Sequence, residues 1–309
     1  MGVLGSFFCL IGLATTCYWT AQLARHVSIH WHQTTLPRYN PTGKDSWALV
    51  TGATDGIGFG FAQELSQRGF NLFLHGRNRE KLSWRQEELQ AQFPNIKTKI
   101  IVSDAASLTG AIDLIVNDIG DARLTVLVNN VGGEPRAYRR LTELTYQDVQ
   151  NTISINITFM TQMTRALLPI LEKNGPSLVM NMSSVVSYGM PYVPVYSGTK
   201  GFVDSFSRSL EAEMKADGKD VEVLGVRVGS VQSAGNDVEV NFTTPDSRTM
   251  AAEALNRVGS GLPLVFGYWG HALPALCLDY IPRDKLIELL ANTMRTLGKE
   301  AEARQAKQS

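Results

Sequence analysis

This sequence has little cysteine, no net charge and no internal repeat. Its 29 basic residues balance its 29 acidic residues, so no positively charged surface for nucleic acid is expected. The apolar content of 44% excludes a disordered chain, and 309 residues suffice for one α/β domain with an added segment. The cysteines show no metal-ligand spacing, so we expect no metal site and interpret them as packed, reduced thiols. They are Cys9, Cys17 and Cys277.

Charged side chains are also absent from Gly2 to Ala24, a largely apolar stretch. At about 1.5 Å per residue, a helix of this length can cross a hydrocarbon layer of about 30 Å. A secretory signal peptide would show a basic start and a small-residue cleavage site, and neither is clear. We therefore interpret residues 1–24 as a membrane anchor with Tyr18 and Trp19 near the lipid boundary. A hydrophobic docking helix is the alternative.

Basic residues follow this segment and favour a cytosolic location for the rest of the chain. They are Arg25, Arg38 and Lys44, with His26, His30 and His32 among them. On this topology none of the sequons at Asn156, Asn181 and Asn241 carries a glycan. A glycan on Asn241 would reverse the topology.

Residues 25–45 are polar and irregular and predict a linker. From residue 46 onward, short apolar segments are separated by helical patterns, and the apolar segments show no polar alternation. This pattern is typical of a parallel sheet covered on both faces, which is the doubly wound Rossmann-type α/β fold. The expected strands cover residues 47–50, 71–74, 99–102, 125–128, 178–181 and 221–228.

The regular pattern ends at Gly229, so residues 46–229 are expected to form the catalytic core. Residues 259–278 have no charge apart from His271, but Pro263 and Pro274 argue against a regular membrane-spanning helix. We expect residues 230–309 to form an apolar substrate lid over the strand ends, followed by a charged helix from Arg283. A second membrane-contacting segment is the alternative for residues 259–278.

A glycine-rich turn follows the first expected strand and opens a helix. Its glycines permit a tight turn, and backbone N–H groups at the helix N-terminus can bind a pyrophosphate. The segment predicts a dinucleotide site that includes Gly52, Thr54, Asp55, Gly56, Ile57 and Gly58.

The second strand is followed by Arg77 and Asn78, without the acidic residue that usually binds the ribose 2′-hydroxyl of NAD. Arginine suits a 2′-phosphate, so NADP(H) is the expected cofactor. Asp104 follows the third strand and is expected near the adenine, and Asn130 follows the fourth.

Tyr196 and Lys200 are four positions apart, so they share one face of an expected helix. A neighbouring ammonium favours the phenolate and lowers the tyrosine pKa toward the working pH, which suits proton transfer. Such a pair alone is usually a surface feature. Its position after a dinucleotide loop favours catalysis.

The glycine motif, the run Asn129-Asn130-Val131-Gly132 and the Tyr196-x-x-x-Lys200 pair together resemble the short-chain dehydrogenase/reductase family. The resemblance covers about residues 46–228. It implies that Tyr196 gives a proton to a carbonyl, that Lys200 binds the nicotinamide ribose, and that Asn156 holds the water of a proton relay.

The family resemblance also implies a serine after the fifth strand that hydrogen-bonds the carbonyl. Ser183 lies 13 positions before Tyr196 (196 minus 183), which is the spacing in many relatives. Serine pairs in the family often use the second residue, which is Ser184 here. We favour Ser183.

Within the family, the sequence resembles the membrane-bound very-long-chain 3-oxoacyl-CoA reductases and their 17-beta-hydroxysteroid dehydrogenase relatives. The shared features are residues 47–58, Val131, residues 267–273 and the N-terminal apolar stretch. The sequence departs at 229–233, where relatives carry proline and threonine beside the nicotinamide and this chain places Val231. It also departs at Gly60, where larger residues are usual, and its last residues form no clear dilysine retrieval signal.

The expected function is NADPH-dependent reduction of a lipid-like ketone such as a 3-oxoacyl-CoA, at the cytosolic face of the endoplasmic reticulum. Steroid-like, polyketide or terpenoid ketones are alternative substrates, and a homodimer is implied by family analogy only. A membrane scaffold that binds NADPH without turnover is the rival from another class. The presence of Tyr196, Lys200, Asn156 and a serine argues against it.

Overall fold

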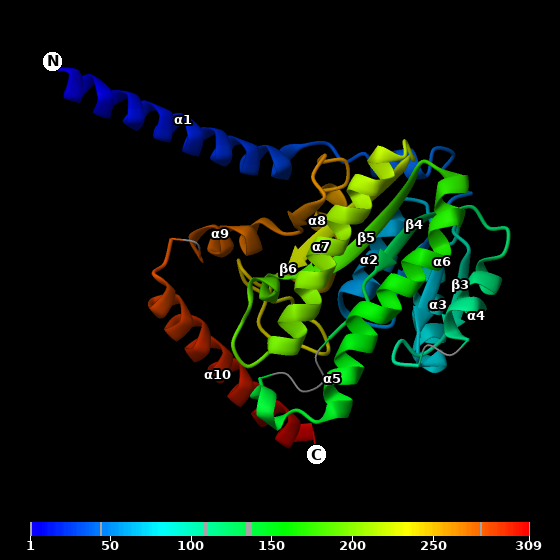
Figure 1. The fold of residues 1–309 in the computed structure, drawn as a ribbon. Helices are drawn as coiled ribbons and strands as arrows, with labels where there is room; N and C mark the ends of the chain where they lie inside the picture. Colours follow the sequence, from blue (N-terminus) through cyan, green and yellow to red (C-terminus); the bar gives the residue numbers. More distant parts are fainter. Residues whose placement is uncertain (1, 44, 108–109, 134–137, 279, 309) are drawn as a thin grey trace.

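The computed structural model describes residues 2–43, 45–107, 110–133, 138–278 and 280–308 (Figure 1). Its centre is a seven-stranded sheet in the order β3-β2-β1-β4-β5-β6-β7, in which every neighbouring pair is parallel. All six expected strands are present. The strands are β1 (Trp47–Thr51), β2 (Asn71–Gly76), β3 (Thr98–Val102), β4 (Leu124–Asn129), β5 (Ser177–Ser184), β6 (Val221–Val228) and β7 (Leu264–Phe266).

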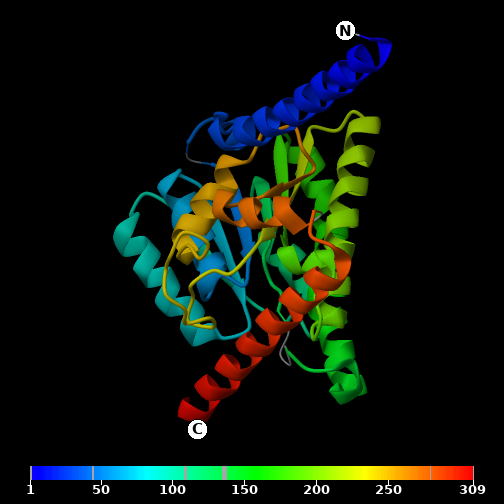
Figure 2. The same ribbon diagram turned by 90° about the vertical axis from the view of Figure 1, so that its left-hand side faces the viewer.

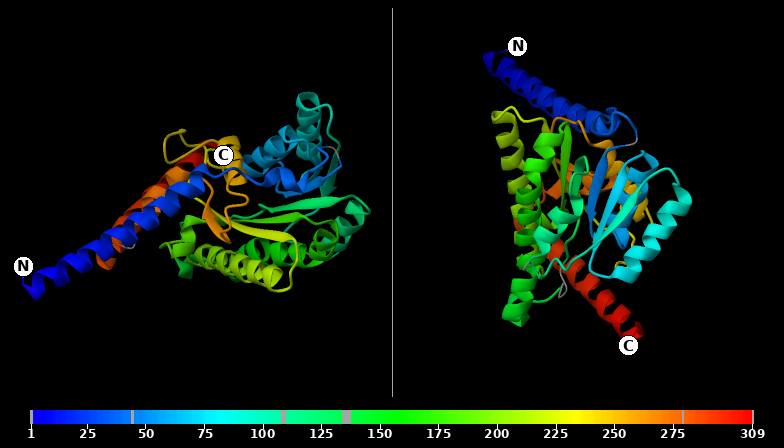
Figure 3. Two further views of the ribbon diagram at one scale, coloured as in Figure 1. Left: turned by 90° about the horizontal axis from the view of Figure 1, so that it is seen from above. Right: turned by 90° about the vertical axis from the view of Figure 1, so that its right-hand side faces the viewer.

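Helices cover both faces of this sheet, which is seen edge-on between two helical layers in Figure 3. One layer contains α2 (Gly56–Gln67), α3 (Arg79–Gln92) and α8 (Ser247–Asn256). The other contains α4 (Ala111–Ile119), α6 (Phe159–Asn174) and α7 (Pro194–Ala216). A short helix, α5 (Tyr146–Ile153), leads into α6 through a π-helical segment, Ser154–Thr158.

Successive strand residues point to opposite layers, which explains why the strands are apolar throughout. Val50 of β1 packs in the core beneath α2, whereas its neighbour Leu49 packs in the core beneath α6. A strand buried on both faces cannot alternate polar with apolar residues. The doubly wound prediction is therefore confirmed.

The strand order places a topological switch point between β1 and β4, because the chain builds outward from β1 in both directions. Loops that leave the carboxyl ends of these two strands diverge and open a crevice, where such sheets bind ligands. The glycine-rich turn and the Asn130 loop both lie at this point.

The expected boundary at residue 229 excludes part of the core. Helix α8 buries Met250, Ala251, Ala254 and Leu255 against α2 and the sheet, and β7 pairs with β6. Of the described helices after residue 229, α9 (Trp269–Leu278) and α10 (Arg283–Gln308) lie outside the two helical layers (Figure 2). Helix α8 was not predicted because most of its exposed side chains are polar. Strand β7 was not predicted because it has only three residues.

Residues 32–43, which lie within the expected linker 25–45, are attached to the core. Helix α1 (Val3–Trp31) runs beyond the expected anchor boundary, and Arg257 Nη1 donates to Ile29 O at 2.7 Å near its end. Thr34 Oγ1 then donates to Leu255 O at 2.8 Å, and Leu36 and Tyr39 are fully buried. The chain after α1 therefore fixes the helix on the body.

Helix α1 projects away from the body in Figures 1 and 2. Its residues Leu4–Ala21 have a mean hydropathy of 1.3 and none is buried, so this helix is long and apolar enough to cross a membrane. Cys9 and Cys17 are exposed on it, which corrects the expectation of packed thiols. The side chain of Cys277 lies outside the described residues.

Gly60, unusual by family analogy, lies where α2 meets α8. A Cβ at this position would lie 2.4 Å from the backbone oxygen of Ser247. Gly60→Ala is expected to force the helices apart and lower the free energy of unfolding by about 1–3 kcal/mol. Gly198→Ala is the matched control, since a Cβ there meets nothing within 4 Å and alanine favours helix. Thermal unfolding of both variants measures the difference.

Candidate active site

The glycine-rich turn is shaped by a left-handed glycine, a close backbone contact and a helix cap at the start of α2. Gly52 has φ +69°, a left-handed conformation that glycine adopts without strain. A Cβ on Gly58 would lie 2.1 Å from Gly52 O, so only glycine permits this packing. Asp55 caps the helix by accepting from Gly56 N at 2.6 Å. The turn thus places the start of α2 at the crevice, where backbone N–H groups of a helix N-terminus can bind a phosphate.

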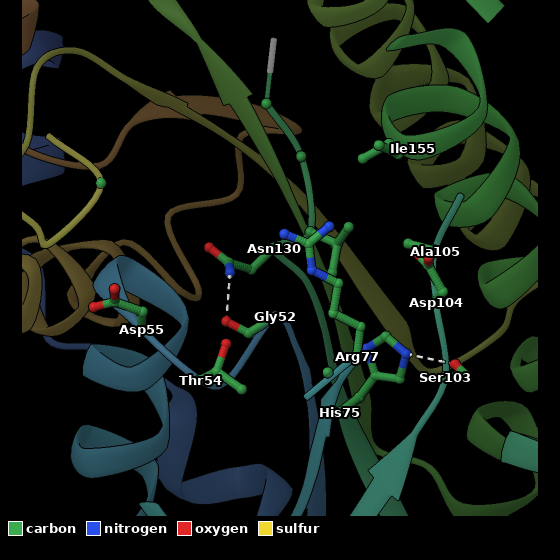
Figure 4. A pocket seen from close by; sticks show the side chains of 15 residues that line it. Gly52, Thr54, Asp55, His75, Arg77, Ser103, Asp104, Ala105, Asn130 and Ile155 are labelled. Atoms are coloured by element: carbon green, nitrogen blue, oxygen red, sulfur yellow. Dashed lines mark hydrogen bonds between the residues drawn. The ribbon is translucent and has the colours of Figure 1, made fainter. Parts of the chain in front are cut away.

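A cavity of about 680 Å³ opens beside this turn (Figure 4). Six predicted cofactor residues line it, and Figure 4 shows Arg77 extending from the end of β2 toward Asn130. Asn130 is itself fixed, because its Nδ2 donates to Thr51 O at 3.0 Å. The six are Gly52, Thr54, Asp55, Arg77, Asp104 and Asn130.

The remaining predicted cofactor residues do not line this cavity. Asn78 caps α3, where its Oδ1 accepts from Lys81 N at 2.9 Å. Val231 is buried after β6, and Gly58 packs against the backbone of Gly52 inside the turn. Gly56, Ile57, Tyr196 and Lys200 likewise lie outside the lining.

Sequence reasoning missed His75 and Ser103 in the cavity wall. His75 is buried at the end of β2, its Nε2 lies 2.7 Å from Ser103 Oγ, and its ring stacks on Phe159. Burial lowers the pKa of His75 to about 4, so the ring is neutral at physiological pH. Its position next to Arg77 at the end of β2 could have indicated that it lines the cavity, but histidine has no standard role there.

Tyr196 and Lys200 lie on α7 as predicted, with Lys200 Nζ 5.4 Å from the centre of the Tyr196 ring. The Lys200 ammonium is buried and donates to Met182 O of β5 at 2.9 Å. Burial lowers the pKa of Lys200 to about 8, and the Asp204 carboxylate opposes that effect. The ammonium is therefore held in a defined place beside the phenol.

Asn156 lies in the π-helical segment and joins it to the loop after β4. Its Nδ2 donates to Gly133 O at 2.7 Å and its Oδ1 accepts from Gly133 N at 3.0 Å. A Cβ on Gly132 would lie 2.8 Å from Asn156 Oδ1 and 3.0 Å from Lys200 Nζ. The structure thus brings Asn156 and Lys200 together around Gly132, at the edge of the cavity.

The two serines at the end of β5 point in opposite directions, as neighbours on a strand do. Ser183 is 4% exposed, and its hydroxyl donates to Asp204 Oδ1 at 2.5 Å in the core. Ser184 is partly exposed, and its Oγ accepts from Val186 N at 3.3 Å, which leaves the hydroxyl proton unused by that bond. This geometry argues against Ser183, our favoured residue, and favours Ser184.

The C-terminal helix α10 approaches the same region. Leu290, Met294 and Leu297 of α10 pack in one apolar cluster with Met190 and Tyr196. The environment of the tyrosine is therefore apolar on this side.

A dinucleotide crevice with a lysine-paired tyrosine at its edge defines the class of nicotinamide-dependent oxidoreductases. Residues 46–241 match the family model for short chain dehydrogenases. The chain is 35% identical over 253 residues to the very-long-chain 3-oxoacyl-CoA reductase-like protein of Arabidopsis thaliana, with 79% of each chain covered. It is 33% identical over 260 residues to the very-long-chain 3-oxoacyl-CoA reductase of Anas platyrhynchos, with 82% of each covered.

Solved structures show the same fold. A 7beta-hydroxysteroid dehydrogenase superposes with a TM-score of 0.71 at 16% identity, over 79% of this chain and 96% of the other. An NADPH complex of a short-chain dehydrogenase from Sphingobium yanoikuyae gives 0.64 at 23% identity, over 76% and 92%. The chain belongs to the short-chain dehydrogenase family.

Proposed function

We propose that the protein reduces a ketone of a lipid-like 3-oxoacyl-CoA to a secondary alcohol, with NADPH as reductant. The observation that carries the proposal is the meeting of Tyr196, Lys200 and Asn156 at the edge of the dinucleotide cavity. The names of the relatives support the acyl-CoA substrate.

The residues at the cavity fit a dinucleotide phosphate. Gly58 lets the backbone turn back on itself, and the α2 N-terminus faces the place where a pyrophosphate would lie. Arg77 is exposed at the cavity, where its guanidinium would pair with a 2′-phosphate. When bound, NADPH supplies the hydride.

The proton comes from the protein. Tyr196 would donate its phenolic proton to the carbonyl oxygen as negative charge develops there. Lys200 stabilises the resulting phenolate, and its bond to Met182 O keeps the ammonium from turning away. Asn156 holds the Gly133 loop in place, and the relay water assigned to it stays a prediction.

Ser184 is proposed to donate a hydrogen bond to the substrate carbonyl. Ser184→Ala is expected to lower kcat about 10²-fold or more, because an oxyanion would lose one fixed donor. Ser183→Ala, its matched control one residue earlier, is expected to reduce stability and to keep most of the rate. Steady-state kinetics with thermal unfolding separates these effects. A larger loss of kcat in Ser183→Ala would restore the original assignment.

The apolar parts of the molecule support the proposed substrate and location. Helix α1 is proposed to anchor the enzyme in the endoplasmic reticulum membrane with the catalytic body in the cytosol. The apolar cluster of α10 beside Tyr196 suits a hydrocarbon chain, and α9 and α10 are proposed as the substrate lid.

One observation favours a second candidate, a steroid-like or specialised-metabolite ketone. The loop after β6 lacks the family's proline, and Gly229 N instead donates to His271 Nδ1 of α9 at 3.0 Å. A Cβ on Gly229 would lie 2.6 Å from His271 Cδ2, so α9 packs directly against this loop. A changed wall beside the nicotinamide would change which ketones fit.

Purified full-length protein assayed for NADPH consumption tests these alternatives. We expect turnover of long-chain 3-oxoacyl-CoA and much weaker turnover of steroid and small polyketide ketones. Turnover of the small ketones without acyl-CoA turnover would contradict the proposed substrate. Tyr196→Phe in the same assay controls for contaminating reductases.

A further inference from the structure

A buried charge pair lies one helical turn beyond Lys200. Asp204 of α7 is 5% exposed, and its Oδ2 accepts from Arg227 Nε at 2.9 Å and Nη2 at 2.8 Å. Its other oxygen accepts the Ser183 hydroxyl at 2.5 Å. These three hydrogen bonds come from residues of β5 and β6, so Asp204 links the lysine helix to both strands.

Arg227 extends the link to the substrate side of the sheet. Its Nη1 donates to Tyr188 Oη at 2.8 Å, and its guanidinium lies 4.6 Å from the centre of the Tyr188 ring. Tyr188 ends the short turn Val185–Tyr188, which begins directly after Ser184. One guanidinium therefore joins the carboxylate beside the lysine to the turn that follows the proposed serine.

Packing alone does not explain an ion pair at this position. Removing two charges from water costs free energy that their attraction recovers only in good geometry, and apolar residues of similar size often serve stability as well. The position instead suggests an electrostatic role. Asp204 and Lys200 are one turn apart on α7 and both are buried, so the carboxylate acts on the charge of the lysine. Asp204 opposes the loss of the lysine proton that burial favours.

The groups that face this lysine are few in the described part of the chain. Helix α7 supplies Tyr196 and Asp204, and β6 supplies Arg227, which pairs with Asp204. Strand β5 supplies the Met182 carbonyl and Ser183, and the π-helical segment supplies the uncharged Asn156. Among these groups, Tyr188 is hydrogen-bonded to Arg227.

We propose that Asp204 and Arg227 are positioning residues that set the charge on Lys200. The carboxylate favours the ammonium form of the lysine, and the guanidinium limits how strongly it does so. The proposal rests on the proposed function in one respect, which is that the Lys200 ammonium acts on Tyr196. It predicts opposite effects from removing the two charges, which no loss of packing would produce.

Absorbance titration of the Tyr196 phenolate tests this without a substrate. The full-length chain in detergent is titrated with base, and the Tyr196→Phe titration is subtracted. In Asp204→Asn, Lys200 loses its proton earlier, so the phenolate midpoint is expected to rise by about 1 on the pH scale. In Arg227→Met, Asp204 loses its guanidinium partner and stabilises the Lys200 ammonium more strongly, so the phenolate midpoint is expected to fall.

Two further variants keep the result interpretable. Glu211→Gln removes a carboxylate from the same helix, where Glu211 pairs with Lys215, and is expected to leave the midpoint unchanged. If Arg227→Met does not fold, Asp204→Asn/Arg227→Met removes both charges and is expected to give a midpoint between wild type and Asp204→Asn. Unchanged midpoints in folded Asp204→Asn, or shifts of the same sign in both single variants, would overturn the proposal.

The kinetic arm separates this proposal from the proposed function. If wild type reduces ketones and Tyr196→Phe does not, while Asp204→Asn titrates like wild type, the proposed role of the charge pair is wrong and the proposed function is retained. If the midpoints move as expected but no ketone is reduced, the proposed function fails and the charge pair stands. In the active enzyme, the basic limb of the pH–rate profile should move with the midpoint.

Discussion

Tyr196→Phe is expected to lower kcat for ketone reduction by about 10²–10⁴-fold, the range that a positioned proton donor contributes. The variant removes one oxygen and keeps the ring, so its packing with Met190 and Met294 is preserved. Binding of NADPH should be retained, because the cavity beside the glycine turn is lined by other residues. Stopped assays for the alcohol product and NADPH fluorescence measure the two quantities separately.

Tyr192→Phe provides the control for this experiment. Tyr192 packs in the same apolar cluster and likewise loses only a hydroxyl, so its rate should stay near that of wild type. A rate for Tyr196→Phe close to wild type would remove the catalytic assignment of Tyr196. Loss of NADPH binding in Tyr196→Phe would instead make the defect one of assembly.

The parts of the fold that the sequence predicted share one physical cause. Strands β1, β2, β4, β5 and β6 are buried on both faces, and a continuous apolar run between helical patterns is typical of such strands. Helix α8 escaped prediction because its burial depends on a partner distant in sequence. Gly60 of α2 was a visible sign of that contact, but it became interpretable only with Ser247 opposite it.

The candidate site was predictable where chemistry depends on local spacing. The turn at Gly52 and the Tyr196–Lys200 pair depend on residues close together in the sequence, and both lie in the structure where the sequence places them. The choice between Ser183 and Ser184 depends on which face of β5 meets α7, and spacing along the chain carries no such information. The same holds for Asp204, whose partner Arg227 lies on another strand.

Arg77 carries the second large prediction, which concerns cofactor choice. Two arginines lie near the Thr54 turn, but Arg85 is already engaged, since its Nε donates to Thr54 O and its Nη1 pairs with Glu88. Arg77 is exposed at the cavity and forms no ion pair within the described residues. It is therefore the cation available to a 2′-phosphate.

Arg77→Ala is expected to lower kcat/KM for NADPH by about 10-fold to 100-fold, because a charge-assisted hydrogen bond contributes about 1.5–3 kcal/mol. The value for NADH, which has no 2′-phosphate, should change little. Arg77→Asp should reverse the preference, since its carboxylate repels the phosphate and can accept from the ribose hydroxyl. Steady-state kinetics with both cofactors gives the ratio directly.

Arg79→Ala is the matched control, because Arg79 is also exposed and lies two positions away, outside the cavity lining. Equal losses of kcat/KM for NADPH and NADH in Arg77→Ala would show that the arginine stabilises the loop and does not bind the 2′-phosphate. The discrimination should also weaken as salt is raised, because screening acts on a pairing of exposed charges. A preference for NADPH that survives both Arg77→Ala and high salt would place its origin elsewhere in the cavity.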